Sequence, residues 1–155
     1  MDVSNKEALI EKSKLFNSHY IGKITELEVA KSFLSMGYQV SSPLVQDSRY
    51  DFIADVKGKL YKIQVKTSTP KDNESCIEFY TRTSHTNTKR TINIKYSPKD
   101  VDYFATMYNG QCYVVPIDKC LGGSKKLRLK PTKNGQNKGI LFAKDFKLED
   151  VFPST

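Results

Sequence analysis

Polar and apolar residues change their spacing after residue 37, and this change divides the chain into a helical part and a strand part. Over Ile24–Met36 apolar side chains recur at helical spacing, which predicts a helix ending at Gly37. Ser4 can cap an earlier helix, predicted over Ser4–Phe16, and Gly22 separates the two helices. The first twenty residues are therefore expected to form a helical extension of the main domain.

Short runs rich in Tyr, Val, Ile and Phe follow, broken by Gly, Pro, Asn and Asp, a pattern typical of strands and turns. The predicted strands are Tyr38–Val40, Tyr50–Val56, Leu60–Thr67, Ile77–Thr81, Tyr103–Met107, Tyr113–Ile117 and Leu127–Leu129. A last helix is expected near Lys138–Asp145. Helices combined with a mixed sheet indicate an α/β fold. Because no repeat or low-complexity linker interrupts the chain, residues 1–155 are expected to form a single domain.

The helix over Ile24–Met36 carries an acidic residue among its apolar side chains. At 100° per residue one face, expected to be buried, collects Leu27, Ala30, Phe33 and Leu34. Glu26 falls inside this stripe, whereas Glu28 lies almost opposite and is expected in solvent. Burying a carboxylate is costly unless a cation offsets its desolvation. Glu26 is thus either a metal-site residue or an ordinary glutamate that lies at the edge of the stripe or pairs with a lysine.

A polar face is predicted on the hairpin that joins Tyr50–Val56 to Leu60–Thr67. If Lys57-Gly58 is a two-residue loop, the register sets Asp51 opposite Gln64, with Lys66 further along the same face. A bulge would shift this register by one residue. Oxygen ligands and an ammonium group suit phosphodiester hydrolysis assisted by a hard divalent cation. An ordinary polar hairpin face is the alternative.

Net charge points to a polyanionic partner. Twenty-five Lys and Arg residues against seventeen Asp and Glu give +8, which fits nucleic acid but also plain solubility. Two basic stretches, Thr81–Arg90 and Ser124–Lys138, suit phosphate contacts, although each could be a solvated loop. Arg49 either contacts DNA or pairs with the carboxylates. The predicted DNA-contacting residues are Arg49, Arg82, Lys89, Arg90, Lys125, Lys126, Arg128, Lys133, Asn134 and Gln136.

Other classes of protein are disfavoured. Three cysteines without a CxxC pair, Cys76, Cys112 and Cys120, argue against a disulfide framework and a zinc site. No apolar run approaches the ~20 residues needed to span a bilayer, so no membrane partner is expected. The N-terminal residues lack an apolar signal core, which predicts an intracellular, cytoplasmic protein.

Three short motifs resemble the PD-(D/E)XK nuclease superfamily in order and spacing: Gly22-Lys23-Ile24-Thr25-Glu26, Arg49-Tyr50-Asp51 and Gln64-Val65-Lys66-Thr67. Further segments are similar to a branch that includes group I intron homing endonucleases of cyanobacteria: Asp47–Asp51, Val101–Ala105, Val114–Ile117 and Thr132–Gln136. The resemblance covers roughly residues 22–145. It implies a restriction-endonuclease-like core, a mixed sheet flanked by helices.

The resemblance also implies a role for each motif residue. Asp51 would be the central metal ligand, Glu26 the helix carboxylate that assists at the metal, and Lys66 the catalytic lysine. Gln64 would occupy the acidic position of the motif, and Val65 would offer its carbonyl oxygen to Mg²⁺, or to Mn²⁺ in its place. The neutral Gln64 departs from the superfamily pattern, although the homing-endonuclease branch shows the same residue. Tyr50 stands where proline is usual.

Three functions remain open on this basis. The first is a sequence-specific homing endonuclease acting on DNA as a homodimer or homotetramer. The second is a Holliday junction resolvase, because archaeal resolvases share the same motif arrangement. The third is a DNA-binding relative without catalysis, which the amide of Gln64 would permit. Cleavage of duplex against four-way junction separates the first two, and binding without cleavage identifies the third.

Overall fold

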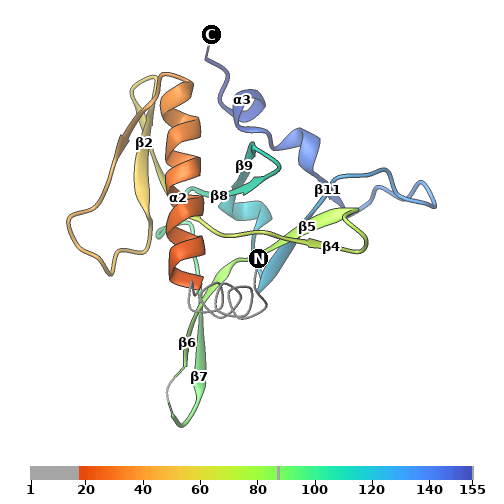
Figure 1. Ribbon diagram of the computed structural model, residues 1–155, viewed down its shortest axis with the longest axis horizontal. Coiled ribbons are helices and arrows are strands. Elements are labelled where there is room, and N and C mark those ends of the chain that lie inside the picture. The colour runs from red at the N-terminus through yellow and green to blue at the C-terminus, as the bar shows by residue number, and fades with distance from the viewer. Residues whose placement is uncertain (1–17, 87, 155) are drawn as a thin grey trace, which may run out of the picture.

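A five-stranded mixed sheet forms the centre of the computed structural model, which describes residues 18–86 and 88–154 (Figure 1). Its strand order is β1-β2-β3-β8-β9, with β3 and β8 parallel and the other neighbours antiparallel. The strands are β1 (Gln39–Ser41), β2 (Phe52–Val56), β3 (Lys59–Val65), β8 (Tyr103–Tyr108) and β9 (Gln111–Pro116). Helix α2 (Ser18–Ser35) packs on one face of this sheet. The helix predicted over Ser4–Phe16 lies outside the described residues.

A second sheet of four strands covers the opposite face. Its order is β11-β10-β5-β4, from β11 (Leu141–Phe142), β10 (Ser124–Arg128), β5 (Cys76–Tyr80) and β4 (Thr69–Lys71). β6 (Arg82–Thr86) and β7 (Thr91–Lys95) form a separate two-stranded ribbon. The chain also contains the 3-10 turns η1 (Ile117–Lys119) and η2 (Ala143–Asp145) and the short helix α3 (Leu148–Val151).

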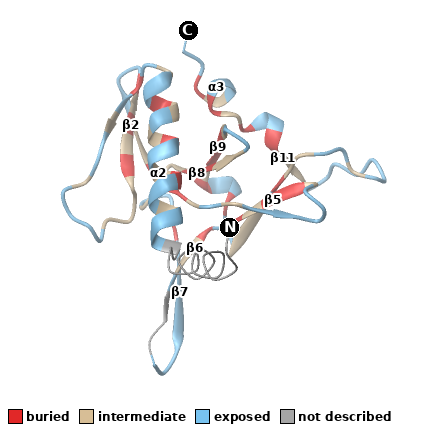
Figure 2. Cartoon of the chain, viewed as in Figure 1, coloured by how far each residue is buried: buried red, intermediate tan, exposed pale blue. Residues whose placement is uncertain are grey.

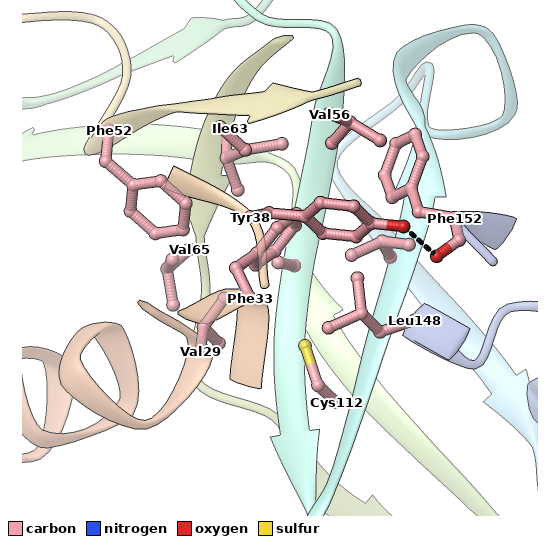
Figure 3. Packing of buried hydrophobic residues seen from close by; sticks show 13 residues of the cluster. Val29, Phe33, Tyr38, Phe52, Val56, Ile63, Val65, Cys112, Leu148 and Phe152 are labelled. Carbon is pink, nitrogen blue, oxygen red and sulfur yellow. Dashed lines mark hydrogen bonds between the residues drawn. The ribbon is translucent and has the colours of Figure 1, made fainter. Parts of the chain in front are cut away.

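Two apolar clusters lie on the two faces of the central sheet, because successive residues of a strand point to opposite faces. On the α2 side, Ala105 and Val114 pack with Phe33 and Phe52, and the Tyr38 hydroxyl donates to the Phe152 carbonyl (Figure 3). On the other side the next residues along each strand pack against β5 and β10; they include Phe104 and Val115, with Phe79 and Leu127 opposite. The central sheet is therefore covered on both faces.

Helix α2 ends where the sequence predicts but does not begin there. Gly37 adopts φ +84°, and the amide groups of Gly37 and Tyr38 donate back to Leu34 and Phe33, which completes a Schellman C-cap. Gly22 lies inside the helix instead of separating two helices. That prediction is wrong because one glycine within a helix costs only about 1 kcal/mol relative to alanine, which packing can offset.

The predicted buried face of α2 is also wrong in part. The sheet covers Thr25, Val29 and Phe33, spaced by four residues, whereas Leu27 and Leu34 are 61% and 57% exposed. Figure 2 shows this outer side of the helix in the colour of exposed residues. Glu28 is exposed, as expected. The helix carries two apolar stripes, and helical spacing alone does not tell which of them meets the sheet.

The predicted strands are all present, with shifted ends, but two segments differ from expectation. Residues 82–86 form strand β6 of the ribbon, not a loop, because β7 pairs with them. The helix expected over Lys138–Asp145 is replaced by β11 and η2, since Leu141 and Phe142 pair with β10. Strands β4, β7 and β11 were not predicted. Among the helices of residues 18–86 and 88–154, none is long and apolar enough to cross a membrane.

Candidate active site

Asp51 lies at the point where β2 and β3 stop pairing. The Lys57-Gly58 loop has positive φ at both residues and sets Val56 against Lys59, as predicted. The ladder ends at the Phe52–Ile63 pair, and the Asp51 amide donates to the Ile63 carbonyl at 2.9 Å. The Asp51 carboxylate then accepts the Val65 N–H at 2.7 Å. Asp51 and Gln64 were predicted to pair across the two strands, but the ladder stops one pair earlier. The Asp51 side chain instead contacts Val65, the residue after Gln64.

Burial makes the Asp51 carboxyl unusually basic. Desolvation raises its pKa from the ordinary 3.8 to about 6, although the Val65 hydrogen bond opposes the shift. The negative charge of Glu26 raises this pKa further, and the positive charges of Lys66 and Lys23 lower it. These interactions place four charged groups in one neighbourhood: two from α2, one just before β2 and one just after β3.

Gln64 and Val65 are the last two residues of β3, where the Val65 N–H meets the Asp51 carboxylate. The Gln64 amide nitrogen lies 3.4 Å from the Val65 carbonyl oxygen, so these two groups face each other. The Val65 side chain points the opposite way, into the core with Val29 and Phe33. Residue 65 therefore contributes its N–H to Asp51 and directs its carbonyl to the side where Gln64 lies.

Glu26 is partly exposed, and the prediction that it is buried in the apolar stripe is wrong. Its side chain is 23% exposed, and Lys23 pairs with both of its oxygens at 3.0 and 3.1 Å. The open alternative, pairing with a lysine, is the one observed. Glu26 still acts electrostatically on Asp51. Lys23 thus balances the charge of a carboxylate that stands close enough to Asp51 to influence it.

Lys66 follows the last residue of β3 and contacts the base of the ribbon. Its backbone amide donates to Ala105 of the parallel strand β8 at 2.9 Å. Its Nζ lies 3.2 Å from the Arg82 carbonyl and 3.5 Å from the Tyr96 hydroxyl, at 5.1 Å from the centre of the Tyr96 ring. The ammonium group is thereby held between the sheet and the ribbon.

Two threonines tie α2 to the end of β3, and sequence reasoning did not identify them. The Thr25 hydroxyl donates to the Ile21 carbonyl at 2.9 Å and lies 3.3 Å from the Thr67 hydroxyl. Thr25 and Thr67 are the immediate neighbours of Glu26 and Lys66, so this contact sets the helix carboxylate relative to the lysine. The spacing of Thr25 from Val29 and Phe33 is the signal that could have revealed its buried position.

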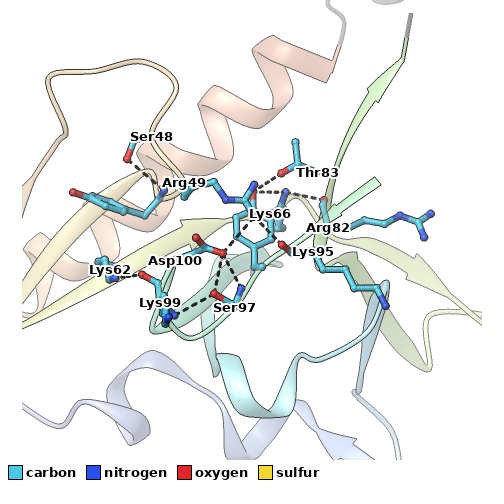
Figure 4. A network of polar contacts seen from close by, with 12 residues as sticks. Ser48, Arg49, Lys62, Lys66, Arg82, Thr83, Lys95, Ser97, Lys99 and Asp100 are labelled. Carbon is cyan, nitrogen blue, oxygen red and sulfur yellow. Dashed lines mark hydrogen bonds and ion pairs between the residues drawn. The ribbon is translucent and has the colours of Figure 1, made fainter. Parts of the chain in front are cut away.

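Arg49 pairs with Asp100 and not with the carboxylates of the site (Figure 4). Its guanidinium is 3.5 Å from the Asp100 carboxylate, donates to the Lys95 carbonyl at 2.9 Å and lies 4.1 Å from the centre of the Tyr96 ring. Backbone hydrogen bonding from Ser97 and the charge of Arg49 lower the pKa of Asp100. Arg49 therefore joins the chain before Asp51 to the end of β7.

A cleft of about 520 Å³ opens beside the Lys66 backbone and side chain. It is lined by Gly22 of α2, by residues 65–67, and by Tyr80, Arg82 and Ser84. The Arg82 guanidinium lies 5.4 Å from the centre of the Tyr80 ring, where the ring face attracts its charge. The cleft thus combines motif residues with a cation from the predicted basic stretch.

The other predicted DNA-contacting residues lie on two separate parts of the molecule. Lys89 and Arg90 belong to the segment between β6 and β7. Lys126 pairs with Asp72 at 3.1 Å, and Arg128 donates to the carbonyls of Lys130 and Pro131. Lys125 is on the same strand, β10, while the exposed loop beyond it carries Lys133, Asn134 and Gln136.

The thiols do not belong to the site. All three predicted free cysteines, Cys76, Cys112 and Cys120, carry free thiols and are buried. Burial raises the pKa of Cys112 and Cys120 to about 12. Among the described residues no group of three or more His, Cys, Asp or Glu could hold a metal ion. Gln64, at the position where the family motif has an acidic residue, is neutral.

The order of these groups agrees with a known family. The sequence profile of the PD-(D/E)XK endonucleases matches residues 16–149, which include Glu26, Asp51, Gln64 and Lys66. The chain belongs to this family. The family and the mixed α/β fold predicted from the motifs are therefore confirmed. The members of this family are described as endonucleases.

Two further similarities place this PD-(D/E)XK chain among known proteins. The fold resembles that of a bacterial homing endonuclease, I-Ssp6803I, with a TM-score of 0.71 over 84% of this chain and 88% of that one, at 23% identity. A 51-residue segment is 39% identical to Protein 5.3 of Escherichia phage T7. That segment is 33% of this chain and 43% of the phage protein, so the chain spans less than half of that relative.

Proposed function

We propose that this protein is a divalent-metal-dependent DNA endonuclease that cuts duplex DNA sequence-specifically, as a homing endonuclease does. The observation that carries the proposal is the desolvated Asp51 carboxylate, placed beside Glu26 and Lys66 at the end of a strand pair. A carboxylate with a raised pKa and a like charge nearby gains most from a bound cation. The fold similarity to I-Ssp6803I supports the homing type.

The donor groups present fit a hard divalent cation. Asp51 and Glu26 would hold it, together with the Gln64 amide oxygen and the Val65 carbonyl, all of them oxygen ligands of the kind that Mg²⁺ and Mn²⁺ accept. A bound ion of this kind supplies Lewis-acid polarisation of the phosphate and lowers the pKa of bound water. Gln64 provides a neutral amide where other members of the superfamily have a carboxylate. The site would therefore carry less negative charge and repel the DNA phosphate less.

The chain's own groups position the reaction. The Val65 N–H fixes the Asp51 carboxylate at 2.7 Å, and the Thr25–Thr67 contact holds α2 against the end of β3. Lys66 presents an ammonium group that can stabilise charge developing on the phosphate or orient the attacking water. Arg82 adds positive charge to the cleft where a DNA backbone would enter.

A cleavage assay with three substrates tests the proposal. Linear duplex, a four-way junction and single-stranded DNA are each incubated with Mg²⁺, with Mn²⁺ and with EDTA. We expect metal-dependent cleavage of duplex by wild type, and loss of at least about 10³-fold in rate for Asp51→Asn and Lys66→Ala. Asp55→Asn is a matched control, since Asp55 is on the same hairpin but bonds the turn amide of Gly58. Preference for the junction would favour a resolvase, and binding without cleavage of any substrate would reject catalysis.

We also propose that the protein is a homo-oligomer, because cutting two strands requires two active sites and one chain supplies one set of motif residues. Strands β8 and β9 are core strands with buried centres. The outer stripe of α2 offers a different surface, with Ile24, Leu27 and Leu34 all more than half exposed. Their spacing of three and seven residues is that of a helix–helix seam, which a twofold axis could place against itself in a homodimer. In a homotetramer a second dimer would extend the DNA contact.

A further inference from the structure

The β6–β7 ribbon projects from the body of the protein past the N-terminal end of α2 (Figure 1). Among the described strands β6 and β7 pair with each other and with no third strand. Every residue of β7 is exposed. Each strand has five residues, about 17 Å at ~3.3 Å per residue. A two-stranded antiparallel ribbon of this kind fits the major groove of B-form DNA.

The ribbon has a polar face and an apolar face. Directly paired residues share a face, so Arg82 with Lys95 and Ser84 with Asn93 stand on one side. Ile94 stands on the other side, as does Ile92, and each is 41% exposed. Arg82 and Ser84 line the cleft beside Lys66, so the polar face continues into the candidate active site.

The Ser84–Asn93 pair is arranged for hydrogen bonding to a base. The Ser84 hydroxyl donates to the Asn93 Oδ1 at 2.7 Å, which fixes the orientation of the amide. An asparagine amide recognises adenine by accepting from N6 and donating to N7 in the major groove. Since Oδ1 has two lone pairs, it can accept from Ser84 and from adenine together.

We infer that the polar face of the β6–β7 ribbon reads base edges in the major groove next to the cleavage site, with Asn93 as the base-reading residue and Ser84 as its positioning residue. Arg82 and Lys95 add positive charge at the base of the ribbon, where the DNA backbone passes. The adjacency to the cut rests on the proposed function, whereas base reading requires only that the protein binds DNA.

The contacts of Lys66 predict where the recognised base pairs lie. Its Nζ is 3.2 Å from the Arg82 carbonyl, and Ser84 follows two residues later, about 7 Å along the strand. With one base pair per ~3.4 Å, the recognised positions should be about two to four base pairs from the cut. Thr83 lies on the opposite face of the ribbon, and its hydroxyl is 2.6 Å from the Tyr96 hydroxyl. The Tyr96 hydroxyl in turn lies 3.5 Å from Lys66 Nζ, so this face of the ribbon is also connected to the lysine.

Binding selection from a randomised duplex library tests the inference without depending on cleavage. Wild type, Asn93→Ala and Ile92→Ala each select duplexes in EDTA, and the enriched pools are sequenced. Ile92→Ala is the matched control, because it truncates an exposed residue of the same strand on the opposite face. We expect Asn93→Ala to lose preference at one or two adjacent base pairs, by roughly 5- to 150-fold, and Ile92→Ala to retain the wild-type preference. If alanine weakens the ribbon, Asn93→Thr, a better strand former, replaces it.

Substitution of 7-deazaadenine at the affected position tests the groove, since it removes the N7 acceptor and leaves the minor groove unchanged. It should lower wild-type affinity and leave the affinity of Asn93→Ala unaltered. An equal loss in both proteins would assign the contact to another residue and overturn the inference. A wild type that enriches no sequence, or an Asn93→Ala pool identical to that of wild type, would overturn it too.

The two proposals fail in different ways. The enriched duplex is finally incubated with wild type and Mg²⁺. Absence of cleavage with an Asn93-dependent preference in the selection would reject the nuclease and keep the ribbon as a base reader. Cleavage with a preference independent of Asn93 would reject the base reader and keep the nuclease. A cut more than about a helical turn from the Asn93-dependent positions would overturn their placement beside Lys66.

Discussion

The Asp51 carboxylate is ionised at neutral pH only at a cost, because burial deprives it of solvent and Glu26 adds a like charge. The folded chain therefore holds the proton of Asp51 more tightly than the unfolded chain between pH 3.8 and about 6. Since the folded state binds more protons in this window, the free energy of unfolding falls as the pH rises through it. Asp51, the proposed metal ligand, thus destabilises the metal-free protein.

Replacing Asp51 by Asn should therefore stabilise the metal-free fold while removing activity. The amide keeps an oxygen for the Val65 N–H but carries no charge. In EDTA at pH 7.5 we expect the free energy of unfolding to rise by about 1–2 kcal/mol relative to wild type, and the gain to vanish below about pH 4. Denaturant unfolding at both pH values measures it. A variant no more stable than wild type at pH 7.5 would contradict the desolvation of Asp51.

Gln64→Glu should strengthen metal binding, because a carboxylate is a better ligand than an amide for a hard cation. We expect the dissociation constant for Mg²⁺ or Mn²⁺, measured by calorimetry without DNA, to fall by about tenfold, equivalent to 1.4 kcal/mol. Gln39→Glu, on an exposed position of β1, adds the same charge away from the site and serves as control. Equal affinities of the two variants would show that residue 64 is not a ligand.

Among the elements, α2 carries the helix carboxylate, and we expect the glycine inside it and the glycine just after it to affect stability in opposite directions. Gly37 adopts φ +84° at the C-cap, where an L side chain is strained, whereas a Cβ at Gly22 would meet no atom within 4 Å. We expect Gly37→Ala to lower the free energy of unfolding by about 1–2 kcal/mol and Gly22→Ala to raise it by about 0.5–1 kcal/mol. Chemical denaturation compares the two. Equal shifts would contradict the helical position of Gly22.

For the whole molecule the net charge of +8 predicts that DNA binding is strongly dependent on salt. Each phosphate contact releases condensed counterions, so six contacts would weaken binding by roughly 10³-fold between 50 and 200 mM salt. Fluorescence anisotropy with a labelled duplex in EDTA gives this slope. Affinity that does not change over this range would argue against DNA as the substrate.

The proposed homodimer predicts that charge on the outer stripe of α2 disrupts assembly. Ile24→Lys combined with Leu27→Lys should convert an oligomer into a monomer of 17.7 kDa in light scattering at micromolar concentration. Leu60→Lys is the control, since Leu60 is 61% exposed, as Leu27 is, but belongs to β3. A wild type that is monomeric and still cuts both strands in one encounter would reject the oligomer.

Local patterns in the sequence were sufficient for the features that depend on near neighbours along the chain. The Gly37 C-cap, the Lys57-Gly58 turn with its Val56–Lys59 register, and the positions of the main strands were predicted correctly. Backbone sterics and strand alternation act over a few residues, so the sequence contains them directly. The motif order was likewise sufficient for the family and the fold.

Other features depend on contacts between segments that are far apart in the sequence, and only the tertiary structure decided them. Both stripes of α2 are apolar, and the sheet meets the one with Val29 and Phe33, which leaves Glu26 partly exposed beside Lys23. The surroundings of Lys66 come from Arg82 and Tyr96, far along the chain. Residues 82–86 form a strand because residues 91–95 pair with them. Whether a residue is buried or a strand is paired depends on two surfaces that meet. The sequence of one segment specifies only the surface of that segment and not the surface that covers it.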